Sequence, residues 1–436
     1  MRFQTQRPAS WQVCTACGNE MVETDPHPRC NVCGGLLEIH HRPPTLTPAE
    51  LLQRFTERRG GPPGATASGV WRFREIVLPS ADAVVSYPEG NTPLVHRVAL
   101  DHWSGIERLL LKHEGQNPTG SFKDRGMTVG VTQARRIGAT AVACASTGNT
   151  AASLAAYAAQ GGLPALVLVP RDGVPTGKLA QALAYGARTL LVRGDFDDCL
   201  RLVEEASEQL GVYLLNSINP FRIEGQKTII LELLQQLSWE SPDWIIFPAG
   251  NLGNTAAFGK ALREARAWGL IDRLPRLAAV QAAGAAPFAR SFAEGFVERH
   301  RVKAATVATA IKIGNPASYD RAVVAIRETN GVVLSVPDAE LLEAKAAIDA
   351  SGVGCEPASA VSLAGLRQLV RSGEVKPTDR VVAVLTGHIL KDPDLLLRYH
   401  QETEPPPPGA NRPVEIEPTL AAVERVLQQK GVNGER

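Results

Sequence analysis

Short apolar runs alternate with longer amphipathic stretches along most of the chain, beginning near Leu109. Within each run the apolar residues are consecutive, which is typical of strands that are covered on both faces of a sheet. The amphipathic stretches between the runs predict helices. The expected strands are Ala141–Ala145, Ala165–Val169, Thr189–Val192, Val212–Leu215, Trp244–Phe247, Leu277–Val280, Val332–Val336 and Val381–Leu385. The expected helices are Thr150–Gln160, Lys178–Ala184, Phe196–Leu210, Gly225–Leu237, Thr255–Trp268 and Asp338–Asp349.

This alternation of strands and helices predicts a mainly parallel α/β fold. It continues for roughly 300 residues, which is more than one compact core usually holds. We therefore expect two mainly parallel α/β lobes with a cleft between them.

The two ends of the chain differ in composition from the α/β region. Residues 41–92 are rich in Pro and Arg and predict one helix, at Pro48–Glu57. Near the other end, the consecutive prolines Pro405–Pro408 predict an extended linker, followed by an amphipathic helix at Thr419–Gln429. The expected parts are a cysteine ribbon at 10–40, a linker and N-terminal segment at 41–90, the two-lobed domain at 91–400, and a proline-rich linker with a C-terminal helix at 401–436.

Composition and charge exclude several classes of protein. The 436 residues are 44% hydrophobic and 21% charged, as in globular domains. The 46 Lys and Arg residues nearly balance the 45 Asp and Glu residues, so no basic excess favours nucleic acid or an anionic membrane. No run of about 18 apolar residues occurs, and Met1–Trp11 lacks the apolar core of a secretory signal. We expect a soluble, cytoplasmic protein.

Four of the seven cysteines form a compact motif near the N-terminus. Cys14, Cys17, Cys30 and Cys33 have the spacing C-x2-C-x12-C-x2-C, in which each pair can bring two thiolates to one metal. Four thiolates leave no open coordination position, so the motif predicts a structural zinc site rather than a catalytic one. The alternatives are two reduced pairs without metal, or disulfides in an oxidising compartment.

A lysine stands at the start of an expected helix, in the motif N-P-T-G-S-F-K-D-R-G at Asn117–Gly126. Lys123 follows a turn of small residues, and the positive potential of a helix N-terminus would act on its amine. Together with partial burial, this potential would lower the pKa of Lys123 and favour the free amine that a Schiff-base lysine needs. The alternative is a surface lysine in the first turn of a helix.

A second motif, A-S-T-G-N-T at Ala145–Thr150, lies between an expected buried strand and an Ala-rich helix. Hydroxyl and amide residues at a helix start are ordinary N-caps. The same residues also form a donor-rich mouth for a carboxylate or a phosphate.

A third motif, A-G-N-L-G-N-T at Ala249–Thr255, follows an expected strand and precedes a helix. Gly250 and Gly253 would let backbone amides approach an oxyanion at the helix N-terminus. The motif is neither G-x-G-x-x-G nor G-x4-G-K-[ST], which disfavours dinucleotide and P-loop sites.

Taken together, the motifs carry a resemblance that covers the chain from about Cys14 to the proline-rich tail. Besides the motifs above, the matching pieces are E-G-N-T-P-L at Glu89–Leu94, N-S-I-N-P-F-R-I-E-G-Q-K-T at Asn216–Thr228, I-G-N-P at Ile313–Pro316, and T-G-H at Thr386–His388 before Lys391. The chain resembles the fold type II family of pyridoxal-phosphate enzymes, the tryptophan synthase β-like family, and within it the threonine synthases.

The resemblance implies roles for individual cofactor-binding residues. Lys123 would form the Schiff base with the aldehyde of pyridoxal 5'-phosphate and then move protons. Asn149 would hydrogen-bond the phenolic oxygen of the cofactor. Thr386 would place its hydroxyl at the pyridine nitrogen, and a neutral hydroxyl, unlike a carboxylate, does not hold that nitrogen protonated. The cofactor phosphate would lie on Gly250, Asn251, Leu252, Gly253 and Asn254.

The resemblance also implies a reaction and a set of substrate contacts. O-phospho-L-homoserine and water would give L-threonine and inorganic phosphate, the last step of threonine biosynthesis, in a homodimeric enzyme. Ser146, Thr147 and Thr150 would surround the substrate carboxylate and phosphate, and Asn216, Ser217 and Arg222 would clamp the phosphate. One position departs from the family pattern, because Ile389 replaces the usual glycine after T-G-H. Tyr319, after I-G-N-P-A-S, is an aromatic residue at a position that is commonly aromatic in the family.

Other functions remain open at this point. Within the family, the rivals are a β-replacing enzyme such as a cysteate synthase that acts on O-phosphoserine, or a threonine or serine dehydratase. A rival of another class is a regulatory protein that binds nucleic acid through the cysteine ribbon. Against this last function stand the near-zero net charge and the lack of basic and aromatic clusters around the ribbon.

Overall fold

The computed structural model describes residues 8–172 and 176–428, and it contains three sheets. The largest has six strands in the order β12-β11-β10-β13-β5-β4. All neighbouring pairs in it are parallel except β4 with β5. Its strands are β4 (Leu94–His96), β5 (Leu109–His113), β10 (Trp244–Pro248), β11 (Arg276–Ala282), β12 (Val332–Val336) and β13 (Val381–Leu385).

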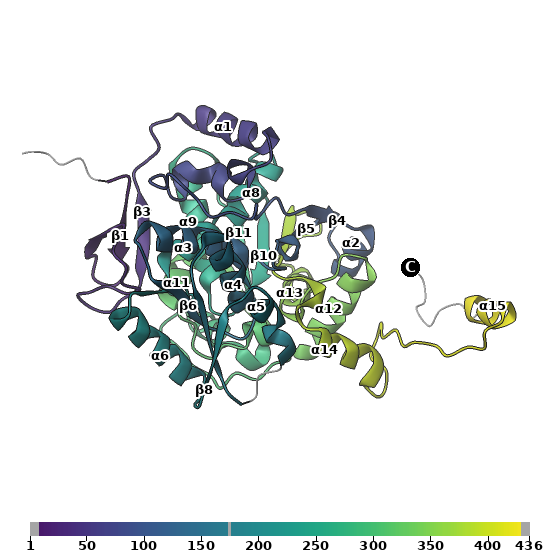
Figure 1. Ribbon diagram of the computed structural model, residues 1–436. Coiled ribbons are helices and arrows are strands. Elements are labelled where there is room, and N and C mark those ends of the chain that lie inside the picture. The colour runs from purple at the N-terminus through teal and green to yellow at the C-terminus, as the bar shows by residue number, and fades with distance from the viewer. Residues whose placement is uncertain (1–7, 173–175, 429–436) are drawn as a thin grey trace, which may run out of the picture.

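A second, wholly parallel sheet has four strands in the order β8-β7-β6-β9. These strands are β6 (Ala141–Ala145), β7 (Ala165–Pro170), β8 (Arg188–Val192) and β9 (Val212–Leu214). They all lie in the chain between β5 and β10, so this lobe is inserted into the lobe of the six-stranded sheet (Figure 1). The expected two-lobed, mainly parallel α/β fold is confirmed.

Burial of the strands agrees with the sequence pattern in the middle of the sheets but not in two of the edge strands. In the edge strand β12, three of five residues are only partly buried. Every residue of β6, β10 and β13 is buried. In contrast, β8 was expected to be covered on both faces, but Leu190 and Leu191 are 42% and 59% exposed. The reason is that β8 is an edge strand that pairs only with β7. An apolar run indicates a strand, but it does not indicate the position of the strand in its sheet.

Helices are found at the expected segments, but one expected helix is divided in two and several helices were not expected. The segment expected as one helix at Gly225–Leu237 is two helices, α7 (Pro220–Gln226) and α8 (Thr228–Gln236), which meet at Lys227. Helix α13 (Pro357–Arg371), which is buried on most of its surface, was not expected, and neither were several other helices of these lobes. The remaining helices of these lobes are α2 (Val98–Ser104), α3 (Lys123–Arg136), α4 (Asn149–Gly161), α5 (Ala180–Ala184), α6 (Phe196–Gln209), α9 (Gly253–Ala267), α10 (Pro287–Ala293), α11 (Tyr319–Glu328), α12 (Asp338–Ala350) and α14 (Pro393–Leu397).

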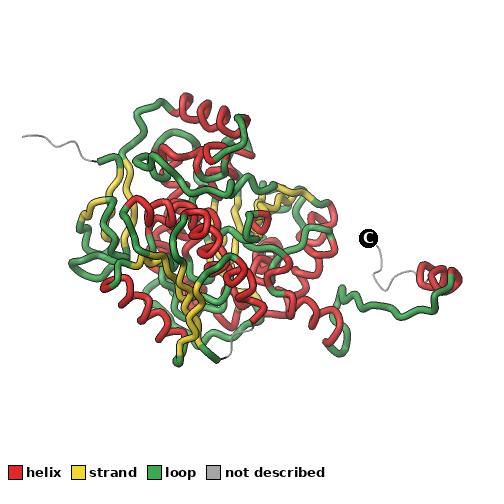
Figure 2. Tube along the Cα trace, in the orientation of Figure 1, coloured by secondary structure: helices red, strands yellow, loops and turns green. Residues whose placement is uncertain are grey.

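The third sheet and the C-terminal helix lie at opposite ends of the molecule (Figures 1 and 2). Strands β1 (Ser10–Cys14), β2 (Glu20–Val22) and β3 (Leu37–His41) form an antiparallel ribbon, followed by α1 (Pro48–Gly60). Helix α15 (Leu420–Gln428) stands clear of the two lobes. Residues 1–7, where no secretory signal is expected, and the last expected helical residue, 429, lie outside the described residues. Within the described ranges, no helix is long and apolar enough to cross a bilayer.

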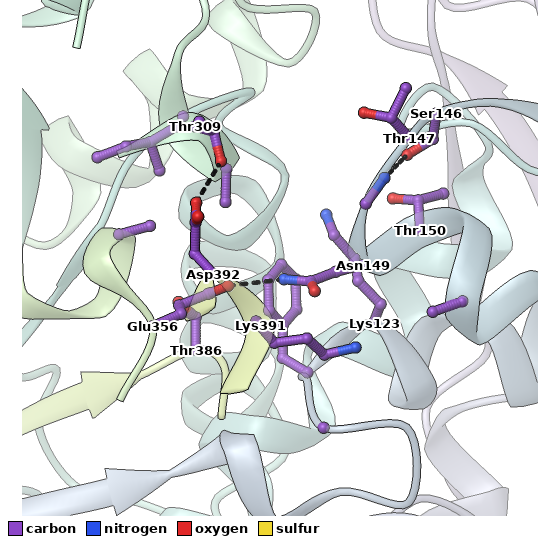
Figure 3. A pocket seen from close by; sticks show the side chains of 18 of the residues that line it. Lys123, Ser146, Thr147, Asn149, Thr150, Thr309, Glu356, Thr386, Lys391 and Asp392 are labelled. Atoms are coloured by element: carbon purple, nitrogen blue, oxygen red, sulfur yellow. Dashed lines mark hydrogen bonds between the residues drawn. The ribbon is translucent and has the colours of Figure 1, made fainter. Parts of the chain in front are cut away.

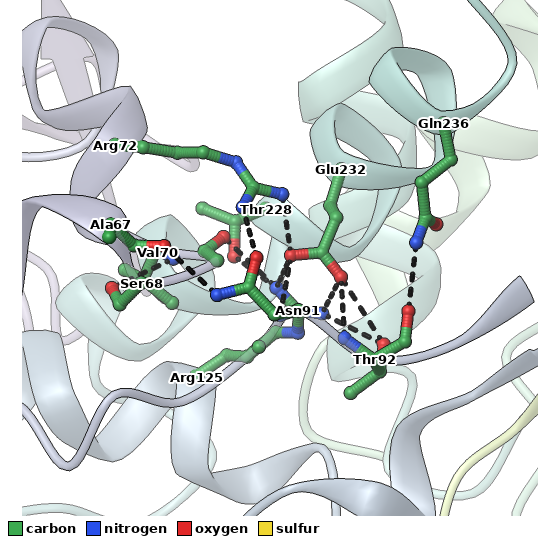
Figure 4. Close-up of polar contacts among 12 residues, drawn as sticks. Ala67, Ser68, Val70, Arg72, Asn91, Thr92, Arg125, Thr228, Glu232 and Gln236 are labelled. Atoms are coloured by element: carbon green, nitrogen blue, oxygen red, sulfur yellow. Dashed lines mark hydrogen bonds and ion pairs between the residues drawn. The ribbon is translucent and has the colours of Figure 1, made fainter. Parts of the chain in front are cut away.

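A buried ion network fixes the segment before β4 to α8 (Figure 4). The carboxylate of Glu232 accepts hydrogen bonds from Arg72, Lys112 and Arg125 at 2.6–2.8 Å. The backbone N–H groups of Asn91 and Thr92 donate to the same carboxylate. Because the group is satisfied on all sides, the E-G-N-T-P-L segment is held in one position at the edge of the large lobe.

Candidate active site

One cavity of about 930 Å³ lies between the two lobes (Figure 3). It is lined by the segments that follow β5, β6, β9, β10 and β13. Carboxyl ends of parallel strands are where ligands bind in open α/β sheets, because loops and helix N-termini converge there. All three chemical motifs of the sequence therefore meet in one place.

Lys123 is the first residue of α3 and lines this cavity, so it is not a surface lysine of an outer helix face. Burial and the nearby positive charge of Arg222 lower the pKa of Lys123 to about 7, against an opposing effect of Glu356. A lysine with this pKa has a substantial fraction of free amine near neutral pH. That is the form that attacks an aldehyde.

The loop between β10 and α9 has the features of a phosphate cradle. Helix α9 has no side-chain cap, so the amides of its first turn are available to a ligand. The residue before the helix, Leu252, has a left-handed φ of 62°, a conformation that is uncommon for non-glycine residues. A Cβ at Gly250 would lie 3.0 Å from the Cα of Ile311, and the buried hydroxyl of Thr255 has no partner. A bound phosphate fits this donor set.

The motif after β6 does not serve as an ordinary N-cap. The N-cap position of α4 belongs to Gly148, and no side chain caps this helix. Ser146, Thr147 and Thr150 line the cavity instead, and the Ser146 hydroxyl accepts the backbone N–H of Gly148 at 3.3 Å. Their hydroxyls are placed to donate to an anion.

Two residues after β9, Asn216 and Ser217, also line the cavity, and they differ in their hydrogen-bond partners. The side-chain amide of Asn216 exchanges two hydrogen bonds with the backbone of Ala145, which ties β9 to the end of β6. One N–H of Asn216 remains for a ligand. The hydroxyl of Ser217 accepts a hydrogen bond from Asn251, so it links the phosphate cradle to the small lobe.

Arg222 lies on α7 behind the cavity wall and is 1% exposed. Its Nη1 donates to the carbonyl of Leu215 at 3.1 Å, whereas Nε and Nη2 have no partner. Burial lowers the pKa of Arg222 to about 10, so the guanidinium is still charged at neutral pH. An unpaired buried cation is unfavourable unless an anion approaches it.

Glu356 is a site residue that the sequence analysis missed. It precedes α13 at the N-cap position, yet its carboxylate makes no capping hydrogen bond and turns into the cavity. Its Oε2 accepts from Nδ2 of Asn149 and its Oε1 accepts from the hydroxyl of Thr386, both at 2.8 Å (Figure 3). An acidic residue before a Pro-initiated helix is a common capping pattern, so the sequence offered no signal for this role.

Two other features of the T-G-H region are clear in the structure. Lys391 lines the cavity and donates to the side-chain oxygen of Gln181 at 2.5 Å. Ile389 turns away from the cavity and packs against Gly354, which has a φ of +69° and no side chain to obstruct it. The isoleucine at this position therefore does not narrow the site.

Tyr319, the aromatic residue after I-G-N-P-A-S, packs edge-on against Phe288 and does not line the cavity.

The four ribbon cysteines converge at a distance from the cavity. Their sulfur atoms all lie within 4.8 Å of one another, with Cys14 and Cys33 3.4 Å apart and Cys17 and Cys30 3.7 Å apart. These separations are too long for disulfides, and none of the four cysteines is disulfide-bonded. Four sulfurs about 2.3 Å from one zinc ion would be about 3.8 Å apart, so the donor set fits a tetrahedral site.

Comparison with known proteins agrees with this geometry. The family described as "Pyridoxal-phosphate dependent enzyme" matches residues 85–387. Threonine synthase of Methanocaldococcus jannaschii is 43% identical over 422 residues, which cover 96% of this chain and 99% of the relative. Threonine synthase of Synechocystis sp. is 45% identical over 360 residues, which cover 80% and 91%. The crystal structure of threonine synthase from Escherichia coli has the same fold, with a TM-score of 0.66, 19% identity, and coverage of 96% of this chain and 99% of that one. This chain therefore belongs to the family of pyridoxal-phosphate dependent enzymes, and these sequence relatives within it are threonine synthases.

Proposed function

We propose that this enzyme converts O-phospho-L-homoserine and water to L-threonine and inorganic phosphate. The observation that carries the proposal is the buried guanidinium of Arg222, in which two nitrogens have no partner. The cradle at Gly250–Asn254 would hold the cofactor phosphate. The guanidinium of Arg222 lies behind the cavity wall, close enough to Lys123 to lower its pKa. A substrate with its own phosphate supplies the anion that Arg222 lacks. The threonine synthase names of the relatives support the same reaction.

The proposed roles follow from position. Bound pyridoxal phosphate supplies an electron sink for negative charge on the substrate carbons near the amine. Lys123 would hold the cofactor aldehyde and then, as a free amine, remove and return protons at the substrate carbons. Asn149 and Thr386 would contact the cofactor ring. Ser146, Thr147 and Thr150 would bind the substrate carboxylate and phosphate, while Asn216, Ser217 and Arg222 would stabilise the phosphate as it leaves.

A substrate panel tests this function. Purified enzyme with pyridoxal phosphate is incubated with O-phospho-L-homoserine, and threonine and phosphate are measured in the same samples. Equal amounts of the two products are expected, with none from Lys123→Ala. A dehydratase would instead release a keto acid and ammonia from threonine or serine, and a cysteate synthase would consume O-phosphoserine. Either result without threonine formation would replace the proposed reaction.

Further properties belong to the same proposal. We expect Cys14, Cys17, Cys30 and Cys33 to hold one structural zinc ion, which elemental analysis of reduced protein measures directly. We expect a cytoplasmic homodimer, which sedimentation and cell fractionation test. The expected division is a ribbon at 10–40, an N-terminal segment at 41–90, a catalytic domain at 91–400 and a tail at 401–436, which limited proteolysis tests.

A further inference from the structure

A chain of three side chains meets the wall of the cavity at Thr386. Ser359 from α13, Thr386 after β13 and Glu356 before α13 are 0%, 3% and 3% exposed. Each hydroxyl has one hydrogen to donate and two lone pairs to accept with. Because these side chains are almost completely buried, the donors and acceptors among them can be counted.

The hydroxyl of Ser359 has a determined direction. Its oxygen accepts the backbone N–H of Thr386 at 2.8 Å and that of Gly387 at 3.2 Å. Both lone pairs are then occupied, so the hydrogen of Ser359 is directed to the Thr386 hydroxyl oxygen, 3.0 Å away. Thr386 is the acceptor in this pair.

The hydroxyl hydrogen of Thr386 is also committed. It is donated to Oε1 of Glu356 at 2.8 Å, while Oε2 of the same carboxylate accepts from Asn149. The carboxylate packs directly on Gly387, where a Cβ would lie 2.4 Å from its Cδ. Both carboxylate oxygens of Glu356 therefore serve as acceptors, one for Thr386 and one for Asn149. Thr386 is left with one lone pair and no hydrogen for the cavity.

We propose that Glu356 is a positioning residue that turns Thr386 into a hydrogen-bond acceptor and so keeps the cofactor ring nitrogen protonated. The ring N–H would donate to Thr386, and Thr386 would donate to Glu356. A carboxylate thus acts on the ring through one hydroxyl. This inference reverses the expectation that a hydroxyl at the ring nitrogen leaves it unprotonated, and it predicts a stronger electron sink. It rests on the cofactor contacts of the proposed function, and not on the identity of the substrate.

Replacement of Glu356 by glutamine provides a sharp test. Asn149 requires an oxygen to donate to, so the new amide places its oxygen there and its NH2 group toward Thr386. Thr386 would then accept from both Ser359 and Gln, and its own hydrogen would be released toward the ring nitrogen. The ring nitrogen would become an acceptor and lose its proton. Ser359→Ala is the matched control, because it disturbs the same chain but leaves Thr386 donating to Glu356.

The experiment is nitrogen-15 NMR of the holoenzyme reconstituted with pyridoxal phosphate labelled at the ring nitrogen. A pyridinium shift is expected for the wild type and for Ser359→Ala, and a neutral pyridine shift for Glu356→Gln. A neutral shift in the wild type overturns the proposal, even if the glutamine variant does not fold. A pyridinium shift in Glu356→Gln, or a neutral one in Ser359→Ala, overturns the hydrogen-bond assignment. No substrate is present, so the result does not depend on threonine formation.

Discussion

His41 Nε2 lies 2.7 Å from Oε2 of Glu224, and both side chains are fully buried. His41 belongs to the last strand of the cysteine ribbon, and Glu224 belongs to α7, the helix that also carries Arg222. Lys227 contacts the same carboxylate oxygen at 2.5 Å. The ribbon is therefore joined to the wall of the active site through buried polar contacts.

Removal of metal from the ribbon should destabilise the enzyme without directly abolishing its chemistry. Among the described residues, the ribbon's own core cluster is Cys14, Met21, Cys30 and Leu37, which is too small to hold three strands without a further constraint. We expect a chelator or Cys17→Ser to lower the melting temperature, while activity persists below the new transition. Asn31→Ser, an exposed change between the ligands, should leave both zinc content and melting temperature unchanged. Equal effects of the two substitutions would contradict a metal role for Cys17.

Cofactor capture should depend on pH through Lys123. Burial and the charge of Arg222 lower the pKa of this amine to about 7, so it becomes a nucleophile as the pH rises through that value. The rate at which apoenzyme gains the absorbance of bound pyridoxal phosphate should increase over the same range. Arg222→Ala removes one of the charges that disfavour the ammonium form, so the midpoint should move to higher pH. A midpoint that stays in place, or moves down, would refute this effect of Arg222.

Arg222→Ala should also impair use of the phosphorylated substrate far more than it impairs cofactor binding. Charge builds on the phosphate as its bond to carbon breaks, so a guanidinium is worth more in the transition state than in the ground state. Loss of one such donor costs about 2–4 kcal/mol, or roughly 30- to 1000-fold in kcat/KM. Arg321→Ala is the control, since Arg321 is also buried with an unpaired Nε but contacts the ribbon. A similar loss of kcat/KM in the control would assign the effect to general destabilisation.

Glu232→Gln keeps the size of the side chain but removes its charge. It should be among the most destabilising single substitutions in this protein. Burial alone would raise the pKa of Glu232, but the charges of Arg125, Lys112 and Arg72 hold it well below its usual range. Removing this carboxylate leaves three buried cations without their common partner, at a cost of about 3–5 kcal/mol in the free energy of unfolding. Glu205→Gln, which loses an exposed partner of Arg201, should cost less than about 0.5 kcal/mol. Denaturant unfolding of both variants makes the comparison, and equal costs would rule out the network as a stabilising unit.

Much of the α/β framework could be predicted from local patterns. The apolar runs at Ala141–Ala145, Val332–Val336 and Val381–Leu385 match β6, β12 and β13 residue for residue. Strand hydrophobicity and helix starts are properties of a few neighbouring residues, so a short window contains them. The lysine at the start of α3 and the glycine loop before α9 were visible for the same reason.

What the sequence determined by itself was most of the central strands, the loops after them that carry Asn149 and the phosphate cradle, and the motif that carries Lys123. Strand β5, which precedes that motif, was not among the expected strands. Only the tertiary structure decided which side chains meet those loops. Glu356 reaches Asn149 across 207 residues of chain, and it looks like a helix cap until its carboxylate is seen to point into the cavity. Arg222 acts on the site from behind its wall, and β8 is exposed because it lies at a sheet edge. Such contacts depend on how two lobes pack against each other, and no local periodicity along the chain records that packing.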